Sequence, residues 1–303
     1  MAVGTRTLPV KVQSVLAQAR TRAGHMGELV MEAHRIASSV LAGWHGRHQQ
    51  GPGENFWQFR PYTTGEPAAN IDWRRSARDN HTYIRDREWD AAQTIFLWPD
   101  SSASMCYQSR AGQHSKEMRA IMLTLILAEI FSRSGERIAI PGMLGPTNTR
   151  NGAERVALAL GSVGKNTETP DFSQVSRHAD AIIISDFLNP VEEIEKKLLP
   201  LAEHHVRTHL IEIADPAEAL FPFSGHITFC DPEDGREFIA GRAQSYQGDY
   251  RLLYEARRNL LAAMCRRYGW SFRTSMTDRP MSEALYHLNI AIRTNAGYKR
   301  EPA

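Results

Sequence analysis

Cysteine, net charge and long apolar runs are all scarce in this sequence. Its three cysteines, Cys106, Cys230 and Cys265, lie far apart and form no Cys-x-x-Cys pair. The sequence therefore predicts neither a disulfide framework nor a structural zinc site, and it favours reduced thiols in the cytoplasm. The formal net charge of +2 gives no general attraction for nucleic acid or an anionic membrane. The longest apolar segment, residues 120–131, is shorter than the roughly 20 residues that a bilayer requires, and Met1–Val10 has no stretch typical of a signal peptide. We therefore expect a cytoplasmic globular protein with neither nucleic acid nor a membrane as a partner.

The usual catalytic motifs are also missing. The chain has no nucleophile elbow, no phosphate-binding Walker loop and no His-Glu-x-x-His pattern, which common hydrolases and ATPases need. Phosphatases of the haloacid dehalogenase kind begin with an aspartate after a buried strand, as Asp100 does, but they need a second aspartate where this chain has Ser102. Such an enzyme would lack its general acid. His205 and His209 straddle the expected start of a strand, so we expect isolated histidines rather than zinc ligands.

The chain divides into three parts by the pattern of its residues, and 42% of them are hydrophobic, enough for a sizeable core. Residues 8–41 carry two sets of apolar side chains at helical spacing, separated by Gly24 and Gly27, and predict two amphipathic helices. Residues 43–53 predict an exposed connector, and Phe56–Trp89 mixes aromatics with charged residues, which favours irregular and β structure. We expect N-terminal helices at residues 1–43, an arginine- and tryptophan-rich extension packed on the main domain at 44–94, and the main domain at 95–303.

Strand and helix patterns alternate in the main domain. After the apolar run that ends at Pro99, strands are expected at residues 137–144, 181–185, 206–213 and 270–274, and helices at 115–132, 153–160, 191–204, 243–268 and 280–293. A turn signal at Asp231–Gly235 predicts a hairpin of residues 226–230 and 236–240. The alternation indicates an α/β fold, with a mostly parallel sheet covered by helices on both faces.

Two acidic residues follow two buried strands. Phe96–Pro99 is apolar and is followed by Asp100, with hydroxyls at Ser102 and Ser104, and a second apolar run, Ala181–Ser185, is followed by Asp186. In an open parallel sheet, ligands collect at the carboxyl ends of the strands. Oxygen ligands of this kind suit Mg²⁺, which prefers octahedral coordination at about 2.0–2.1 Å. The alternative is that Asp100 and the serines only cap a helix or close a turn; the second acid favours the metal.

Two sets of motifs carry a family resemblance. The first is Asp100-x-Ser102-x-Ser104-Met105 with GERIA at residues 135–139 and SDF at 185–187, and it resembles the von Willebrand factor A fold with its metal-ion-dependent adhesion site. The second, RPYTTGEPAANIDWRRSAR at residues 60–78, resembles the signature of domain-of-unknown-function family 58. Members of that family carry such a domain and are commonly encoded beside MoxR-type AAA+ ATPases. The resemblance covers about residues 53–294 and implies a doubly wound sheet.

The resemblance implies a set of metal ligands. Four of them are Asp100, Ser102, Ser104 and Asp186, the last often through water. A threonine from a third loop completes the set, and we choose Thr169, with Thr167 as the alternative. Residues 145–149 look similar to the usual glycine-threonine loop but come one helix too early. The expected cofactor is Mg²⁺, with Mn²⁺ or Ca²⁺ as alternatives.

Two functions from different classes follow from these residues. The first is a non-enzymatic adaptor that presents the metal to an acidic residue of a partner, either a MoxR-type ATPase or the client that this ATPase remodels. The second is a metal-dependent hydrolase of phosphate or ester groups at the same ion. The arginine-rich segment could be a docking surface, but we favour a structural clasp of buried Arg–Asp pairs with Trp73 packed over them.

Overall fold

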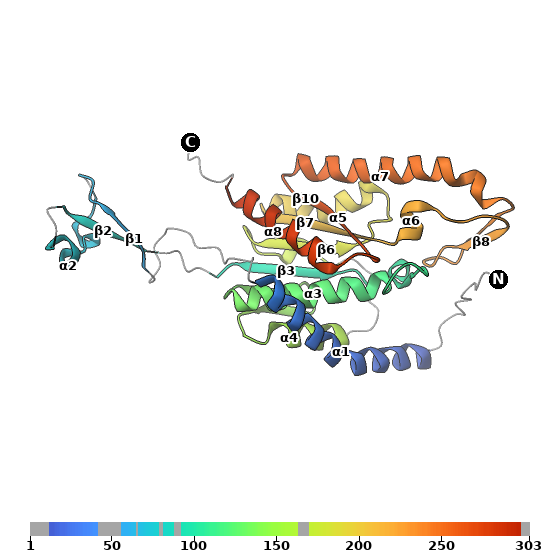
Figure 1. The fold of residues 1–303 in the computed structure, drawn as a ribbon, viewed down its shortest axis with the longest axis horizontal. Helices are drawn as coiled ribbons and strands as arrows, with labels where there is room; N and C mark the ends of the chain where they lie inside the picture. The colour runs from blue at the N-terminus through green and yellow to red at the C-terminus, as the bar shows by residue number, and fades with distance from the viewer. Residues whose placement is uncertain are drawn as a thin grey trace. The chain divides into compact units, whose positions relative to one another are not determined.

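The computed structural model describes residues 12–41, 56–64, 66–78, 81–87, 92–162 and 170–297 (Figure 1). The chain forms two compact units. The main unit comprises Met1–Trp44 together with Thr94–Ala303, and the small unit comprises His45–Gln93.

A six-stranded sheet runs through the main unit in the order β10-β7-β6-β3-β4-β5. Its strands are β3 (Thr94–Pro99), β4 (Arg137–Ile140), β5 (Leu144–Thr147), β6 (Asp180–Ser185), β7 (Arg207–Ala214) and β10 (Ser271–Met276). Every neighbouring pair is parallel except β4 and β5. A separate hairpin joins β8 (Ile227–Cys230) to β9 (Glu237–Ala240). The main unit is thus a mixed α/β structure with a mostly parallel sheet, as the alternating pattern predicts.

Alternate residues of the central strands enter two different hydrophobic cores. In β3, Ile95 and Leu97 belong to one core, and Phe96 and Trp98 to the other. This follows from the two-residue period of a strand, and it explains why both faces of β3 and β6 are apolar. The helices of the first core are α1 (Val12–Leu41), α3 (Lys116–Arg133), α4 (Gly152–Ser162) and α8 (Met281–Gly297), and those of the second are α5 (Val191–Glu203) and α7 (Gln247–Arg267).

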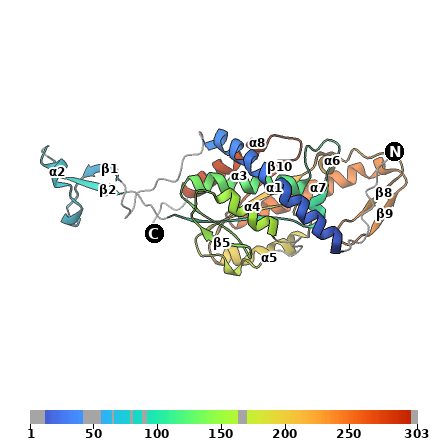
Figure 2. The same ribbon diagram turned by 90° about the horizontal axis from the view of Figure 1, so that it is seen from below.

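The N-terminal helices form one continuous helix, α1 (Val12–Leu41), so the expected pair is wrong. Glycine in a helix interior keeps its backbone hydrogen bonds and destabilises the helix by only about 1 kcal/mol relative to alanine. Gly24 and Gly27 therefore do not end the helix. Val30, Ala33 and Ala37 are buried in the first core. Figures 1 and 2 show α1 lying against α3 and α4.

Two further elements differ from the sequence predictions. The strand expected at residues 137–144 is confirmed only as far as Ile140, the end of β4. The chain then turns through Gly142, whose φ of +72° favours glycine, and returns as the antiparallel β5. The short helix α6 (Pro216–Leu220) was missed. It begins at a capping box: the Asp215 carboxylate accepts the N–H of Ala217, and the Glu218 carboxylate accepts the N–H of Asp215.

The small unit is an antiparallel pair of strands, β1 (Phe56–Pro61) and β2 (Tyr83–Arg87), with the one-turn helix α2 (Trp73–Ser76) between them in sequence. Arg60 pairs with Glu66, with 2.5 Å between Nη2 and Oε1. The Trp73 side chain is 65% exposed. The predicted packing of Trp73 over buried ion pairs is therefore wrong, whereas several of the arginines and aspartates in that prediction have side chains outside the described ones.

None of the helices in the described ranges has both the length and the hydropathy needed to cross a bilayer.

Candidate functional site

The candidate site lies where the order of the sheet strands reverses. From β3 the chain adds β4 on one side and later β6 on the other, and ligand sites of open α/β sheets form at such a point, outside the carboxyl ends of the strands. Asp100 follows β3, and its N–H donates to the carbonyl of Ile184 in β6 at 2.8 Å. Asp186 follows β6. The two acids predicted from separate strands thus reach the same edge of the sheet.

A cavity of about 300 Å³ opens between these strand ends. Four of the five predicted ligands line it: Asp100, Ser102, Ser104 and Asp186. The fifth, Thr169, and its alternative Thr167 lie outside the described residues. Trp98, Ile183 and Phe187 supply apolar walls to the cavity, and polar side chains, among them Asn189 and Lys197, supply about as much of its lining.

The carboxylate of Asp100 is held by two hydrogen bonds. Ser102 N donates to Oδ1 at 2.8 Å, and Ser185 Oγ donates to Oδ2 at 2.6 Å. Burial raises the pKa of Asp100, these hydrogen bonds lower it in part, and the nearby charge of Asp186 raises it again. Two partly desolvated carboxylates therefore repel one another here, and a cation between them would relieve the repulsion.

The spacing of the two serine hydroxyls fits a small octahedral cation. A one-turn 3₁₀ helix, Ala103–Cys106, begins after Ser102 and brings the Oγ of Ser104 to 3.1 Å from the Oγ of Ser102. Adjacent ligands of an octahedral Mg²⁺ at about 2.1 Å stand about 3.0 Å apart, which is 1.4 times the metal–oxygen distance. This separation, which is here a hydrogen bond between the two hydroxyls, and the oxygen donors of Asp100, Ser102, Ser104 and Asp186 fit the predicted ion.

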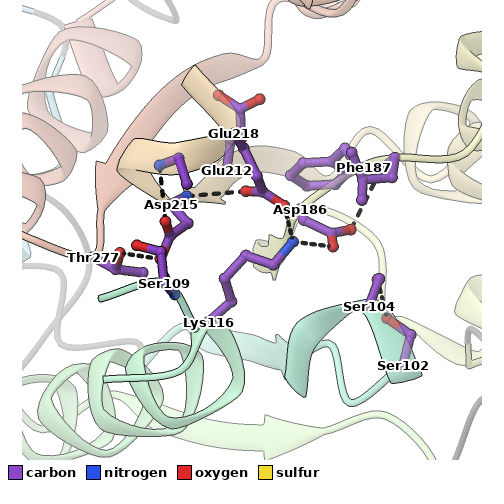
Figure 3. Close-up of polar contacts among 12 residues, drawn as sticks. Ser102, Ser104, Ser109, Lys116, Asp186, Phe187, Glu212, Asp215, Glu218 and Thr277 are labelled. Carbon is purple, nitrogen blue, oxygen red and sulfur yellow. Dashed lines mark hydrogen bonds and ion pairs between the residues drawn. The ribbon is translucent and has the colours of Figure 1, made fainter. Parts of the chain in front are cut away.

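A buried lysine contacts the second acid (Figure 3). The Nζ of Lys116 lies 2.8 Å from Asp186 Oδ2 and 2.6 Å from Glu218 Oε1, and the Lys116 residue is 0% exposed. Burial by itself disfavours the ammonium, but the two carboxylates outweigh this and raise the pKa of Lys116. Lys116 therefore stays charged, and it neutralises part of the negative charge that Asp186 would offer to a metal.

The partners of Lys116 are themselves fixed by hydrogen bonds. Glu218 Oε2 accepts the N–H of Asp215 at 3.0 Å in the capping box of α6. The Oδ2 of Asp215 accepts from Ser109 N at 3.1 Å and from Thr277 Oγ1 at 3.0 Å (Figure 3). This network ties the loop before α3 and the start of α6 to the rim of the site, so Lys116 and Asp186 are held in place.

A further carboxylate reaches the site from the β8–β9 hairpin. Glu233 lies in the turn of that hairpin and lines the cavity. Its Oε1 accepts the N–H of Ser104 at 2.9 Å. The side chain is exposed, so it stands at the open side of the cavity beside the two serines.

Sequence reasoning missed Lys116, Glu218 and Glu233. Lys116 does carry a signal, because a positive charge in the first turn of a helix opposes the helix dipole and therefore calls for an anionic partner. The spacing Asp215-x-x-Glu218 is that of a capping box, but it does not indicate the contact with Lys116. Glu233 carries no such signal, since it is 129 residues from Ser104 in the sequence.

Fold and site together define a mixed α/β protein whose mostly parallel sheet carries acidic and hydroxyl side chains at its carboxyl edge. The chain belongs to the family described as Protein of unknown function DUF58, whose model matches residues 58–259. This confirms the family resemblance drawn from the motifs at residues 60–78.

Relatives of this chain are found in mycobacteria. Uncharacterized protein Rv1480 of Mycobacterium tuberculosis (strain ATCC 25618 / H37Rv) and Uncharacterized protein Mb1516 of Mycobacterium bovis are each 27% identical over 261 residues, which is 79% of this chain and 80% of each relative. Among solved structures, the conserved hypothetical protein BatB from Bacteroides thetaiotaomicron matches with a TM-score of 0.42 and 14% identity over 68% of this chain and 100% of that one. An aerotolerance-related membrane protein from Bacteroides fragilis NCTC 9343 matches with a TM-score of 0.41 and 13% identity over 67% and 100%.

Proposed function

We propose that this chain is a non-enzymatic, metal-dependent protein-binding adaptor with a von Willebrand factor A-like main domain. Its ion is Mg²⁺, held by Asp100, Ser102, Ser104 and Asp186, with Thr169 from the third loop. The observation that carries the proposal is the meeting of two carboxylates and two hydroxyls in one cavity at the reversal of strand order. The hydroxyl separation of 3.1 Å supports an octahedral ion.

The charges around the cavity support binding of an acidic partner. Asp186 shares its negative charge with Lys116, at 2.8 Å, so Asp100 is the main uncompensated carboxylate of the ligand set. A bound Mg²⁺ would therefore keep part of its positive charge and supply an attachment point for a carboxylate from another protein. We propose that the partner is a MoxR-type AAA+ ATPase or the client of such an ATPase, because the family motifs at residues 60–78 resemble those of proteins encoded beside such ATPases.

Glu233 occupies the place through which a partner's acid would enter. Its carboxylate stands at the open side of the cavity, hydrogen-bonded to Ser104 N. A partner's carboxylate would have to displace it or share the site with it, since two like charges at this distance repel. Glu233 therefore lowers the affinity for acidic partners, and removing its charge should raise that affinity.

The adaptor is tested by binding of a MoxR-type ATPase from the same organism. We expect capture by the wild type in Mg²⁺, and loss of capture both in chelator and in Asp100→Ala. Asp249→Ala, which removes an exposed carboxylate from α7, is the matched control and should bind as the wild type does. Equal capture under all conditions would remove the metal from the mechanism.

The second candidate is a hydrolase of phosphate or ester groups, and Glu233 is the observation that favours it. A carboxylate beside the ion and open to solvent could act as a general base toward water. The two candidates make opposite predictions for Glu233→Gln: an adaptor binds its acidic partner more tightly, whereas a hydrolase loses about 10²- to 10⁴-fold in rate. Partner affinity and hydrolysis of a generic aryl phosphate or ester, measured on the same preparation, distinguish them.

A further inference from the structure

Three metal-ligating side chains meet on the far side of α3 from the sheet, where α1 and α4 pack against it. They are His34 of α1, Glu129 of α3 and Glu154 of α4. The Nε2 of His34 lies 3.3 Å from Glu129 Oε2 and 3.5 Å from Glu154 Oε1, and one ligand atom of each residue lies within 4.8 Å of the others. None of these residues takes part in the site around Asp100.

Three polar atoms of this cluster are buried without hydrogen bonds, although the Glu154 atom that faces His34 is Oε1 and the unsatisfied one is Oε2. Among the described residues, His34 Nε2, Glu129 Oε2 and Glu154 Oε2 have no hydrogen-bond partner, and Glu129 is only 2% exposed. A buried polar atom left unsatisfied costs about 1–3 kcal/mol, and more when it is charged. Three such atoms in one place are unusual in a native protein, and a cation bound among them would satisfy all three.

We infer that His34, Glu129 and Glu154 bind a divalent transition metal of the Zn²⁺ class. Tetrahedral ligands at about 2.0–2.1 Å from zinc stand about 3.3 Å apart, which is 1.63 times the metal–ligand distance. The two distances from Nε2, 3.3 and 3.5 Å, match this spacing. One imidazole and two carboxylates leave a fourth position for water, and the nitrogen ligand favours zinc over magnesium.

A second layer of contacts orients one of the ligands. Arg133 Nε binds Glu129 Oε1 at 2.5 Å, which leaves Oε2 of the same carboxylate directed at His34. The Nη1 of Arg133 also donates to Ser38 Oγ at 3.0 Å, and Ser38 lies one turn after His34 on α1. Partners of this kind set the direction of metal ligands and tune their affinity.

The consequence is a metal link between α1 and the rest of the main unit. Without the metal, α1 is held by its buried apolar residues, among them Val30, Ala33 and Ala37. The metal adds ligands from three separate helices, so it stabilises the docked position of α1 through binding energy that only the folded arrangement can collect. This role is independent of the proposed function.

The competing explanation is a protonated His34 that pairs with both glutamates. Both contacts, at 3.3 and 3.5 Å, lie within ion-pair distance but outside hydrogen-bond geometry. The two explanations differ in metal content, which can be measured directly.

The test is zinc binding by the full-length chain, freed of metal and dialysed against Zn²⁺ in the presence of excess Mg²⁺. We expect one zinc per chain in the wild type, in His226→Ala, an exposed histidine elsewhere, and in Asp100→Ala. We expect His34→Ala and Glu154→Gln to lose at least about 100-fold in zinc affinity, and Arg133→Met about 10- to 100-fold. The Glu154 side chain is 42% exposed, so Glu154→Gln should fold normally. It therefore tests the site even if His34→Ala does not fold.

X-ray absorption at the zinc edge identifies the ligands. Nitrogen and oxygen scatterers at about 2.0–2.1 Å support the site, whereas sulfur at about 2.3 Å would assign the metal to the cysteines and overturn it. Absence of zinc from the wild type, or its retention in both His34→Ala and Glu154→Gln, would also overturn the inference. Loss of zinc from Asp100→Ala would show that the metal belongs to the other site.

Discussion

Replacing Lys116 with methionine should lower the free energy of unfolding and raise the affinity for Mg²⁺. The substitution keeps the apolar stem of the side chain and removes only the ammonium, which lies 2.8 Å from Asp186 and 2.6 Å from Glu218. Asp186 is 4% exposed, so its carboxylate would be left buried without its partner. Breaking a buried ion pair from one side costs about 3–5 kcal/mol. We expect Lys116→Met to lose that much free energy of unfolding in chelator.

The same substitution should tighten the binding of Mg²⁺. An ammonium bonded to a ligand of the ion lies about 5–7 Å from the ion itself, and at an effective dielectric constant near 20 the repulsion between the two is ~5–7 kcal/mol. Water and relaxation of the site reduce this value, so we expect an affinity gain of at least about tenfold, or ~1.4 kcal/mol. Magnesium should therefore stabilise the variant more than it stabilises the wild type.

Urea unfolding with and without Mg²⁺, together with calorimetric titration of the folded protein, measures both effects. Lys196→Met is the control, because Lys196 is an exposed lysine of α5 and its loss should change stability by less than about 0.5 kcal/mol. A Lys116→Met protein as stable as the wild type in chelator would refute the ion-pair reasoning. An unchanged or weaker affinity for Mg²⁺ would refute the assignment of Asp186 as a ligand.

Three further predictions concern packing and pH, and all are read from urea unfolding. Gly152→Ala should lower the free energy of unfolding by about 1–3 kcal/mol, because the new Cβ would stand 1.8 Å from Ser132 Oγ. Gly161→Ala in the same helix is the control: its Cβ meets nothing closer than 4.0 Å, so it should stabilise the protein by about 0.5–1 kcal/mol. Leu97→Ala should cost about 2–5 kcal/mol, since Leu97 is 0% exposed; a loss below 1 kcal/mol would contradict its place in the core. Burial raises the pKa of Glu212 despite the arginines beside it. The stabilisation from its protonated carboxyl is therefore complete below the usual pKa of 4.5 and is lost as the pH rises through the raised pKa. The stability of the wild type relative to Glu212→Gln should fall over that pH range, and a constant difference would contradict the raised pKa.

Local patterns were sufficient for most secondary structure of the main unit. The central strands are apolar on both faces, which is typical of buried parallel strands, and α3 begins at Ser115, whose Oγ accepts the N–H of Met118. The same local reasoning fails for α1, because Gly24 and Gly27 predict a break, but the helix continues through them and packs against α3 and α4. It also fails at Gly142, where one run of apolar residues holds a turn.

Contacts between distant segments could not be predicted in this way. Lys116 and Asp186 are 70 residues apart, and Lys116 and Glu218 are 102 apart. The residues around Lys116 do not indicate which acid it will pair with, because an ion pair depends on which segments of the chain lie close together in the folded protein. The cluster of His34, Glu129 and Glu154 is a stronger example, since each residue lies on a different helix and none belongs to a short spacing motif.

Spacing within a few residues was enough to predict the alternation of the central strands and helices, the family, and the two acids and two hydroxyls that follow buried strands. The packing of distant segments was needed to find that Lys116 pairs with Asp186 and Glu218, that Glu233 reaches Ser104, and that His34 meets two glutamates between three helices. These arrangements arise when helices and loops far apart in the chain are packed against one sheet, and their geometry is fixed by the cores rather than by any local pattern.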